Sequence, residues 1–211
     1  MNMPRNGFKA ALAHDATQYG IWAGFATGYA AEIVAGLGYD WMLIDGEHAP
    51  NTVPSVLNQL QTVAPYATAP VVRAVNGDAS LIKQLLDVGA QTLMIPMVET
   101  AEQAQALVRA MRYPPHGIRG VGGGLTRATR WDGVANYLQT AHEELCLIVQ
   151  VESRLGAENV AAIAAVEGVD AVFIGPADLS IGLGHAGNPG HPEVQERIRH
   201  AVDGPWVVWP R

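Results

Sequence analysis

Six short runs of almost unbroken aliphatic and aromatic residues constrain this sequence more than any other feature. They cover residues 20–26, 41–45, 70–75, 92–98, 145–152 and 171–178. A strand with one face in water alternates apolar and polar residues, whereas a strand buried on both faces is apolar throughout. The six runs are therefore expected to be strands of a parallel sheet that is covered on both sides.

Amphipathic segments separate these runs, for example residues 52–63, 79–90, 100–112 and 157–168. Several begin at Thr, Ser or Asp and end at Gly, which are helix-capping residues. Regular alternation of strand and helix implies right-handed crossovers, in either a doubly wound sheet or a (β/α) barrel. No change in composition divides the 211 residues, so the sequence predicts one α/β domain.

Polar side chains follow four of the predicted strands at the point where each strand ends. In a parallel barrel all strands end at the same face, where the loops that follow them build the active site. One polar strand end is commonly a helix cap, but four together indicate a site. The side chains are Asp45, Glu47, His48, Arg73, Gln150, Glu152 and Asp178.

The residue types at these strand ends indicate a chemistry. Glu152 and Asp178 are oxygen ligands that suit Mg²⁺ or Mn²⁺ and would admit Co²⁺ or Zn²⁺; the alternative is a helix cap and a solvated loop acid. Arg73 keeps its proton and suits an oxyanion, unless it forms a structural ion pair. An imidazole can titrate near neutrality, so His48 is a candidate acid or base that Asp45 could orient, although it could also be an ordinary loop residue.

Composition excludes several classes of function. Only Lys9 and Lys83 are lysines, and neither lies at a strand end, so imine chemistry is not expected. The formal net charge of −7 disfavours nucleic acid and anionic membranes as partners. The sequence contains neither a signal-peptide core nor an apolar run of membrane-spanning length, which predicts a soluble cytoplasmic protein.

Three further residues are expected to have no chemical role. Cys146 lies within an apolar strand, where a lone thiol is most often a small core residue. His185 and His191 flank the segment AGNPG without a metal-binding spacing, so both are expected to be loop residues.

A family resemblance rests on six motifs. They are WMLIDGEHAPN, PVVR, IKQLLDVGAQTLMIPMV, RYPPHGIRGVG, VQVES and VFIGPADLS. With these motifs in this order, the sequence from about residue 8 to about residue 202 resembles the metal-dependent (class II) pyruvate aldolases of the 4-hydroxy-2-oxoheptanedioate aldolase type. The resemblance implies a (β/α)₈ TIM-barrel fold of the phosphoenolpyruvate/pyruvate superfamily and a homo-oligomer, a hexamer in the family.

The reaction that the resemblance implies is the reversible cleavage of a 4-hydroxy-2-oxo acid to pyruvate and an aldehyde. For 4-hydroxy-2-oxoheptanedioate that aldehyde is succinate semialdehyde. Two alternatives remain open at this point. One is a sugar-acid aldolase, which cleaves 2-keto-3-deoxy-L-rhamnonate or 5-keto-4-deoxyglucarate. The other is a truncated, inactive barrel.

The resemblance also assigns roles to individual residues. Glu152 and Asp178 match the metal ligands, and Arg73 matches the residue that stabilises the pyruvate enolate. His48, paired with Asp45, matches an acid/base element that acts through a metal-bound water. The residues that would line the pyruvate site are Gln150, Gly175, Pro176 and Ala177. Asp87 matches an acid that supports the site from an adjoining subunit.

The C-terminal residues depart from the family pattern. Members continue through two further βα units, whereas this chain ends in DGPWVVWPR, in which residues 206–209 are at most a stub of a seventh strand. The expectation is therefore a single (β/α) barrel domain over residues 1–211 that lacks the last two units. Such a barrel would leave two sheet edges unpaired, which predicts low solubility and little activity.

Overall fold

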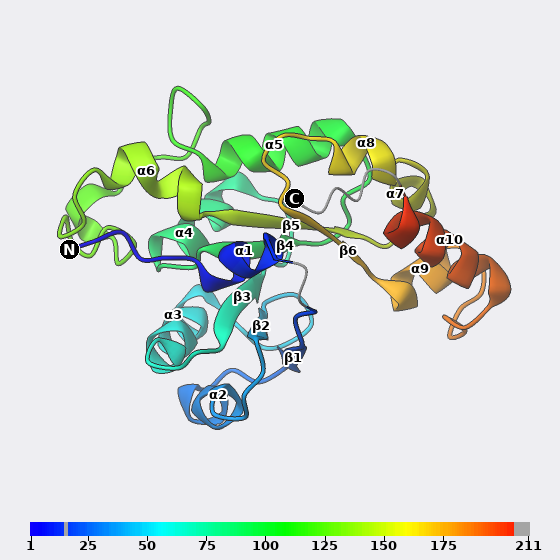
Figure 1. Ribbon diagram of the computed structural model, residues 1–211, viewed down its shortest axis with the longest axis horizontal. Coiled ribbons are helices and arrows are strands. Elements are labelled where there is room, and N and C mark those ends of the chain that lie inside the picture. Colours follow the sequence, from blue (N-terminus) through cyan, green and yellow to red (C-terminus); the bar gives the residue numbers. More distant parts are fainter. Residues whose placement is uncertain (15–16, 205–211) are drawn as a thin grey trace.

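All six predicted strands form in the protein. The computed structural model describes residues 1–14 and 17–204, so the expected stub at 206–209 lies outside the described residues. The six strands pair in parallel in sequence order and form a curled half-barrel (Figure 1). They are β1 (Gly20–Ala23), β2 (Trp41–Asp45), β3 (Ala69–Arg73), β4 (Thr92–Ile95), β5 (Cys146–Val151) and β6 (Ala171–Ile174). A doubly wound sheet reverses its strand order, so this order identifies the barrel type.

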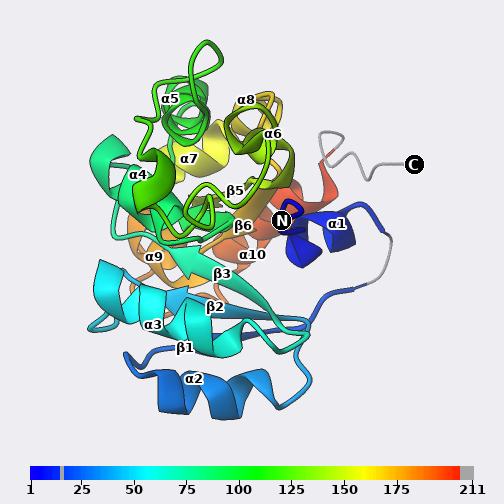
Figure 2. The same ribbon diagram turned by 90° about the vertical axis from the view of Figure 1, so that its left-hand side faces the viewer.

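Helices cover the outside of the half-barrel. Figure 2 shows α2 to α5 following one another around the sheet. These four helices are α2 (Gly28–Ala35), α3 (Val53–Val63), α4 (Ala79–Asp87) and α5 (Ala101–Met111). The remaining helices are α1 (Gly7–Leu12), α6 (Tyr137–Glu144), α7 (Arg154–Glu158), α8 (Val160–Ala164), α9 (Pro176–Gly182) and α10 (Pro192–Asp203), with a 3₁₀ turn at Gly123–Leu125. None of the described helices is long and apolar enough to cross a membrane.

One helix prediction is wrong in detail. The segment 157–168 was expected as a single helix, but α7 ends and α8 begins around Asn159. The Asn159 side chain donates a hydrogen bond of 2.8 Å to the backbone oxygen of Glu99. Asn is a weak helix former, which agrees with a break between two short helices at this residue.

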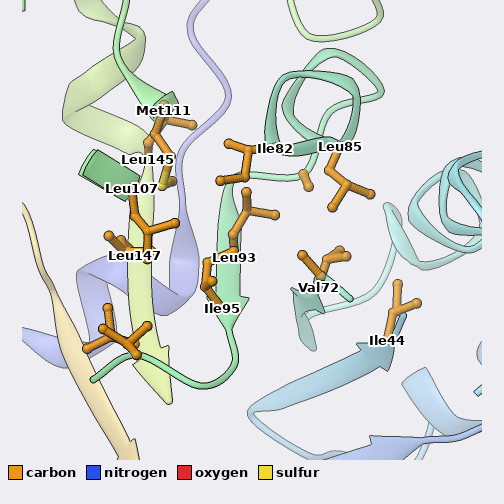
Figure 3. Packing of buried hydrophobic residues seen from close by; sticks show 14 of the residues in the cluster. Ile44, Val72, Ile82, Leu85, Leu93, Ile95, Leu107, Met111, Leu145 and Leu147 are labelled. Atoms are coloured by element: carbon orange, nitrogen blue, oxygen red, sulfur yellow. The ribbon is translucent and has the colours of Figure 1, made fainter. Parts of the chain in front are cut away.

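Both faces of the central strands β2 to β5 are largely buried, as the apolar runs predict, whereas the edge strands β1 and β6 are partly exposed, because each has a neighbouring strand on one side only. Alternate residues point outward into a core shared with the helices, which Figure 3 shows from close by. Its labelled members are Ile44, Val72, Ile82, Leu85, Leu93, Ile95, Leu107, Met111, Leu145 and Leu147. The residues between them point inward and form a second cluster of Phe8, Leu43, Val71, Met94, Cys146 and Ile148. Cys146 is thus a core residue, as expected.

Helix α1 closes the amino end of the half-barrel. Phe8 enters the inner cluster and meets Trp41 edge-on, with 5.8 Å between ring centroids. The Asn6 amide donates to Thr92 Oγ1 at 2.9 Å, where β4 begins. Lys9 Nζ donates to the oxygen of Leu145, just before β5, at 2.6 Å. Because this end is occupied by protein, the carboxyl ends of the strands are left to form a site.

Candidate active site

Asp45 and Arg73 form the centre of the site. They end β2 and β3 and stand opposite each other in the parallel register, and both are buried. Arg73 Nε donates to Asp45 Oδ1 at 2.9 Å, and Arg73 Nη2 donates to Asp45 Oδ2 at 2.6 Å. This bidentate pair fixes the plane of the guanidinium and leaves Nη1 as the nitrogen that Asp45 does not use.

The carboxylate of Asp45 stays ionised in this setting. Burial by itself would raise its pKa, but hydrogen bonds from Arg73, from the backbone N–H of Glu47 and from Trp22 together lower the pKa to about 2. Asp45 is therefore a permanent negative charge that orients Arg73, and it is not a proton donor near neutrality.

Trp22 is also a member of the site, although no role was assigned to it from the sequence. Its Nε1 donates to Asp45 Oδ2 at 3.1 Å, and its ring lies 4.9 Å from Arg73 Cζ. The indole therefore holds the carboxylate with its edge and the guanidinium with its face. The sequence feature that could have indicated this role is the position of Trp22 near the carboxyl end of the first strand, at the same mouth of the barrel.

The loop after β2 approaches β3 closely. Gly46 donates its N–H to the backbone oxygen of Arg73 at 2.8 Å, and a Cβ at Gly46 would lie 2.6 Å from that oxygen. Only glycine fits this contact, so Gly46 lets the next residue, Glu47, lie against Arg73.

Glu47, to which no role was assigned from sequence, is brought against Arg73. Its Oε2 lies 2.9 Å from Arg73 Nη1, but the two groups are not aligned for a hydrogen bond, and this buried oxygen has no other hydrogen-bond partner. Burial raises the pKa of Glu47, and the nearby charges of Glu152 and Asp45 add to this, against the opposing effect of Arg73 and His48. Glu47 thus places a carboxylate oxygen beside the one nitrogen of Arg73 that Asp45 does not use.

His48 lies at the rim of the site. Its side chain is 67% exposed, and its Nε2 is 3.8 Å from Glu47 Oε2. Asp45 was expected to orient the imidazole, but Asp45 Oδ1 instead accepts from the backbone N–H of His48 at 3.3 Å. Arg73 and Trp22 engage the carboxylate, so the described acid beside the ring is Glu47.

Glu152 leaves the end of β5 and is held by three neighbours. Its Oε1 accepts the backbone N–H of Met97 at 3.0 Å, and its Oε2 accepts from Gln150 Nε2. Met97 has a φ of 55°, an uncommon value for a residue with a side chain. Gly175 packs so closely that a Cβ there would lie 2.5 Å from Glu152 Oε2. Glu152 is therefore a fixed, buried carboxylate.

Asp178 reaches the same end of the sheet from the next strand. The β5–β6 register ends with Val151 opposite Ile174, so Glu152 and Gly175 are neighbours. Pro176 and Ala177 follow, and Asp178 lies exposed in the first turn of α9. Of the residues expected to line the pyruvate site, Gln150 and Gly175 lie against the carboxylate of Glu152.

The donor set at this end of the sheet fits a hard divalent cation. Glu152 and Asp178 supply carboxylate oxygens, and the buried Oε1 of Gln150 has no hydrogen-bond partner among the described residues. Mg²⁺ and Mn²⁺ prefer oxygen ligands, and Mg²⁺ is usually bound through one or two carboxylates with water and substrate completing its shell.

Asp87 lies at the opposite end of the fold. It is the last residue of α4, a helix that leaves the carboxyl end of β3 and returns to the amino end of β4. Its Oδ1 accepts from Arg119 Nη2 at 2.7 Å, and the Arg119 guanidinium lies 4.6 Å from the Tyr113 ring centroid. The structure therefore does not bring Asp87 to the Arg73 site of the same chain.

The half-barrel, with polar side chains gathered at the carboxyl ends of its parallel strands, is the architecture of a barrel enzyme. The profile of the HpcH/HpaI aldolase/citrate lyase family matches residues 18–204. The chain belongs to this family, and the relatives named below are aldolases, which are carbon–carbon lyases. Aldolases of the family depend in general on a divalent metal.

Two relatives and one solved structure illustrate the similarity. A hydroxypyruvate/pyruvate aldolase of Delftia acidovorans is 74% identical over 96% of this chain and 75% of its own. A 4-hydroxy-2-oxo-heptane-1,7-dioate aldolase of Escherichia coli is 57% identical over 93% of this chain and 75% of its own. The crystal structure of a family member from Burkholderia cenocepacia is 42% identical, with a TM-score of 0.90 over 94% of this chain and 79% of that one.

Proposed function

We propose that the protein is a metal-dependent pyruvate aldolase. It reversibly cleaves 4-hydroxy-2-oxo acids, with 4-hydroxy-2-oxoheptanedioate giving pyruvate and succinate semialdehyde. The observation that carries this proposal is the bidentate Asp45–Arg73 pair, because it aims a fixed guanidinium nitrogen at the mouth of the barrel. A preorganised donor of this kind suits an oxyanion that develops during reaction.

The bond changes of the cleavage define what the site must do. The C4 hydroxyl loses a proton, the C3–C4 bond breaks, and the aldehyde leaves. The bonding electrons move to the C2 oxygen and form the pyruvate enolate, which takes up a proton at C3. Arg73 Nη1 stabilises the developing oxyanion in this scheme. His48 holds the transferred proton, since its imidazole is exposed at the rim of the site and an imidazole can both accept and donate a proton.

Glu152 and Asp178 would hold the divalent cation, Mg²⁺ or Mn²⁺ by ligand type, with Co²⁺ or Zn²⁺ also accepted. When bound, the cation polarises the carbonyl of the 2-oxo acid. Gln150, Gly175, Pro176 and Ala177 would line the same region. The two lysines give no alternative, because Lys9 binds Leu145 and Asp170 at the amino end of the barrel and Lys83 lies on α4.

The identity of the substrates rests on the relatives more than on the site. The Delftia relative carries hydroxypyruvate in its name and the Escherichia relative carries a heptanedioate. A C3 hydroxyl on the 2-oxo acid leaves the roles of Arg73 and Glu152 unchanged. Hydroxypyruvate is therefore a second nucleophilic substrate to test beside pyruvate. The sugar-acid aldolase reaction remains the alternative for the aldehyde half.

We further propose that the working enzyme is a homo-oligomer in which Asp87 of one copy supports the Arg73 site of another. Asp87 and Arg119 lie beside a loop that exposes apolar side chains to solvent. These side chains are Ile118, Val121, Leu125 and Trp131, of which Leu125 is 91% exposed. Large exposed apolar groups on one loop favour burial against a second copy.

A substrate panel tests the proposed function. Pyruvate release is measured from 4-hydroxy-2-oxoheptanedioate and the two sugar acids, with added Mn²⁺ or Mg²⁺, and aldol addition is measured with pyruvate and hydroxypyruvate. We expect turnover of the heptanedioate and complete loss in excess EDTA. Full activity in EDTA, or an imine trapped by borohydride, would contradict the metal-dependent assignment. Preference for a sugar acid would change only the proposed aldehyde half.

A further inference from the structure

Two histidines expected to be ordinary loop residues lie together in the structure. The rings of His185 and His191 are stacked, with centroids 3.4 Å apart and planes 15° apart. Glu193 joins them: its Oε2 lies 2.8 Å from His185 Nε2, and its backbone N–H donates to His191 Nδ1 at 3.3 Å. One ligand atom from each of the three residues can be chosen so that all lie within 4.8 Å of one another.

We propose that His185, His191 and Glu193 form a second cation site, for a divalent transition metal such as Zn²⁺. Two imidazoles and one carboxylate are the donors that Zn²⁺, Ni²⁺ and Cu²⁺ favour over Mg²⁺. The site is distinct from the oxygen-donor site at Glu152 and Asp178. Helix α9 separates the two, because Asp178 lies in its first turn and His185 lies beyond its end.

An imidazole binds a metal through a ring nitrogen that carries no proton. The two rings are stacked with their centroids 3.4 Å apart, an arrangement in which two positive charges would repel each other. His191 already accepts a hydrogen bond at Nδ1, so that nitrogen is unprotonated. A metal ion between His185 Nε2 and Glu193 Oε2 would replace the proton that these two atoms share.

The backbone holds the three residues in place without a metal. His185 donates its N–H to the oxygen of Ser180 at 2.7 Å, Asn188 donates to the oxygen of His185, and His191 donates to the oxygen of Asn188. Both rings and the carboxylate remain partly exposed, so water can complete the coordination shell. A site that is formed before binding loses little conformational entropy when the ion enters.

Two nearby positive groups oppose a cation here. Arg154 Nη1 lies 3.8 Å from Glu193 Oε1, and the site is at the N-terminus of α10. Arg154 faces the oxygen of Glu193 that the His185 contact does not use, and its side chain is 49% exposed, which weakens its effect through solvent screening. The carboxylate of Glu193 in the first turn offsets the helix dipole.

The consequence of binding would be structural. The ion would join the loop after α9 to the start of α10, at the end of α9 opposite Asp178. Because a ligand that binds only the folded state stabilises it, Zn²⁺ should raise the melting temperature of the protein. This effect is independent of the aldolase reaction, so the second site can be tested without an activity assay.

The test uses the full chain with the Asp178→Asn substitution, which weakens the first cation site. Zn²⁺ is titrated calorimetrically into this background and into versions that also carry His185→Gln, His191→Asn or Glu193→Gln. Asn is a favoured N-cap residue, so His191→Asn removes the imidazole and keeps a cap for α10. His14→Gln, at an exposed histidine far from the cluster in sequence, is the matched control.

We expect the background to bind Zn²⁺ and each substitution in the cluster to weaken binding at least about tenfold, while the control binds as the background does. Cu²⁺ should show nitrogen hyperfine splitting in its electron paramagnetic resonance spectrum, and the two histidine variants should reduce it. Binding of equal strength in the background and in both histidine variants would overturn the proposal. So would a background that binds no Zn²⁺.

Discussion

Asp45 holds Arg73 through two parallel hydrogen bonds, from Nε at 2.9 Å and from Nη2 at 2.6 Å. A guanidinium held in this way cannot rotate. Its third nitrogen, Nη1, is therefore fixed so that it points toward Glu47 and the mouth of the barrel. The pair also explains how a buried arginine is tolerated next to the core, because its charge is matched by a carboxylate that stays ionised.

Replacing Arg73 by Lys keeps the positive charge but removes the planar guanidinium that donates two parallel hydrogen bonds. An ammonium can satisfy one oxygen of Asp45 but cannot span both and still point a donor outward. We expect the proposed enolate stabilisation to fall by roughly 3–4 kcal/mol, a loss of about 10²–10³-fold in rate. Proton exchange at the methyl group of pyruvate, followed by NMR, measures this step directly. Exchange as fast as in the parent would make Arg73 a structural residue.

Replacing Asp45 by Asn should produce a pH-dependent loss of stability. The pKa of Asp45 is lowered from 3.8 to about 2, so its ionised form stabilises the fold above about pH 4 and loses this contribution as the pH falls toward 2. The shift corresponds to about 2 kcal/mol. In urea unfolding, the advantage of the parent over Asp45→Asn should therefore be constant above about pH 5 and smaller at about pH 3. An advantage independent of pH would mean that the carboxylate charge contributes nothing.

Replacing His48 by Ala should slow proton transfer without weakening the binding of metal or pyruvate. The side chain is mostly exposed and is not proposed to bind the cation, so metal and pyruvate affinities should stay close to those of the parent. Turnover should fall by about 10²–10⁴-fold, which is the usual contribution of a general acid or base. Calorimetric titration of Mn²⁺ is the control. A large loss of Mn²⁺ affinity would place His48 among the metal ligands instead.

The two proposed metal ligands should differ in their effect on stability. Glu152 is buried and accepts hydrogen bonds from Met97 and Gln150, whereas Asp178 is exposed. Glu152→Gln should therefore reduce the free energy of unfolding by about 1–3 kcal/mol, and Asp178→Asn by less than about 0.5 kcal/mol. Both should abolish Mn²⁺-dependent turnover. Parental turnover in either variant would remove that residue from the ligand set.

Much of this arrangement follows from the sequence for simple reasons. Runs that are apolar on successive residues predict strands buried on both faces, and parallel strands end at one face, so the acids, the imidazole and Arg73 could be expected together. The side chain that pairs with Asp45 could not be expected from the sequence. His48 is three residues away and Arg73 is twenty-eight, and the choice between them depends on the β2–β3 register, which no local pattern encodes.

Two further features were missed for related reasons. A tryptophan that binds a carboxylate and an arginine has the same strand context as one that only fills a core, so Trp22 was not distinguished. The stacking of His185 on His191 depends on how the loop between them turns back, which their spacing in sequence does not reveal.

Mixing two impaired variants tests the proposed role of Asp87 in a neighbouring subunit. Asp87 ends α4 at the amino end of the barrel, so it can act at an Arg73 site only in another copy of the chain. Asp87→Asn keeps the volume of the side chain and should reduce turnover, although Arg119 then loses its charged partner. Arg73→Lys should be nearly inactive by itself. In a mixed oligomer, some sites would combine an intact Asp87 with an intact Arg73. We therefore expect turnover to rise when the two variants are unfolded and refolded together, and not when each is refolded alone. A mixture that never exceeds the sum of its components, although light scattering shows oligomers, would place the role of Asp87 within its own subunit.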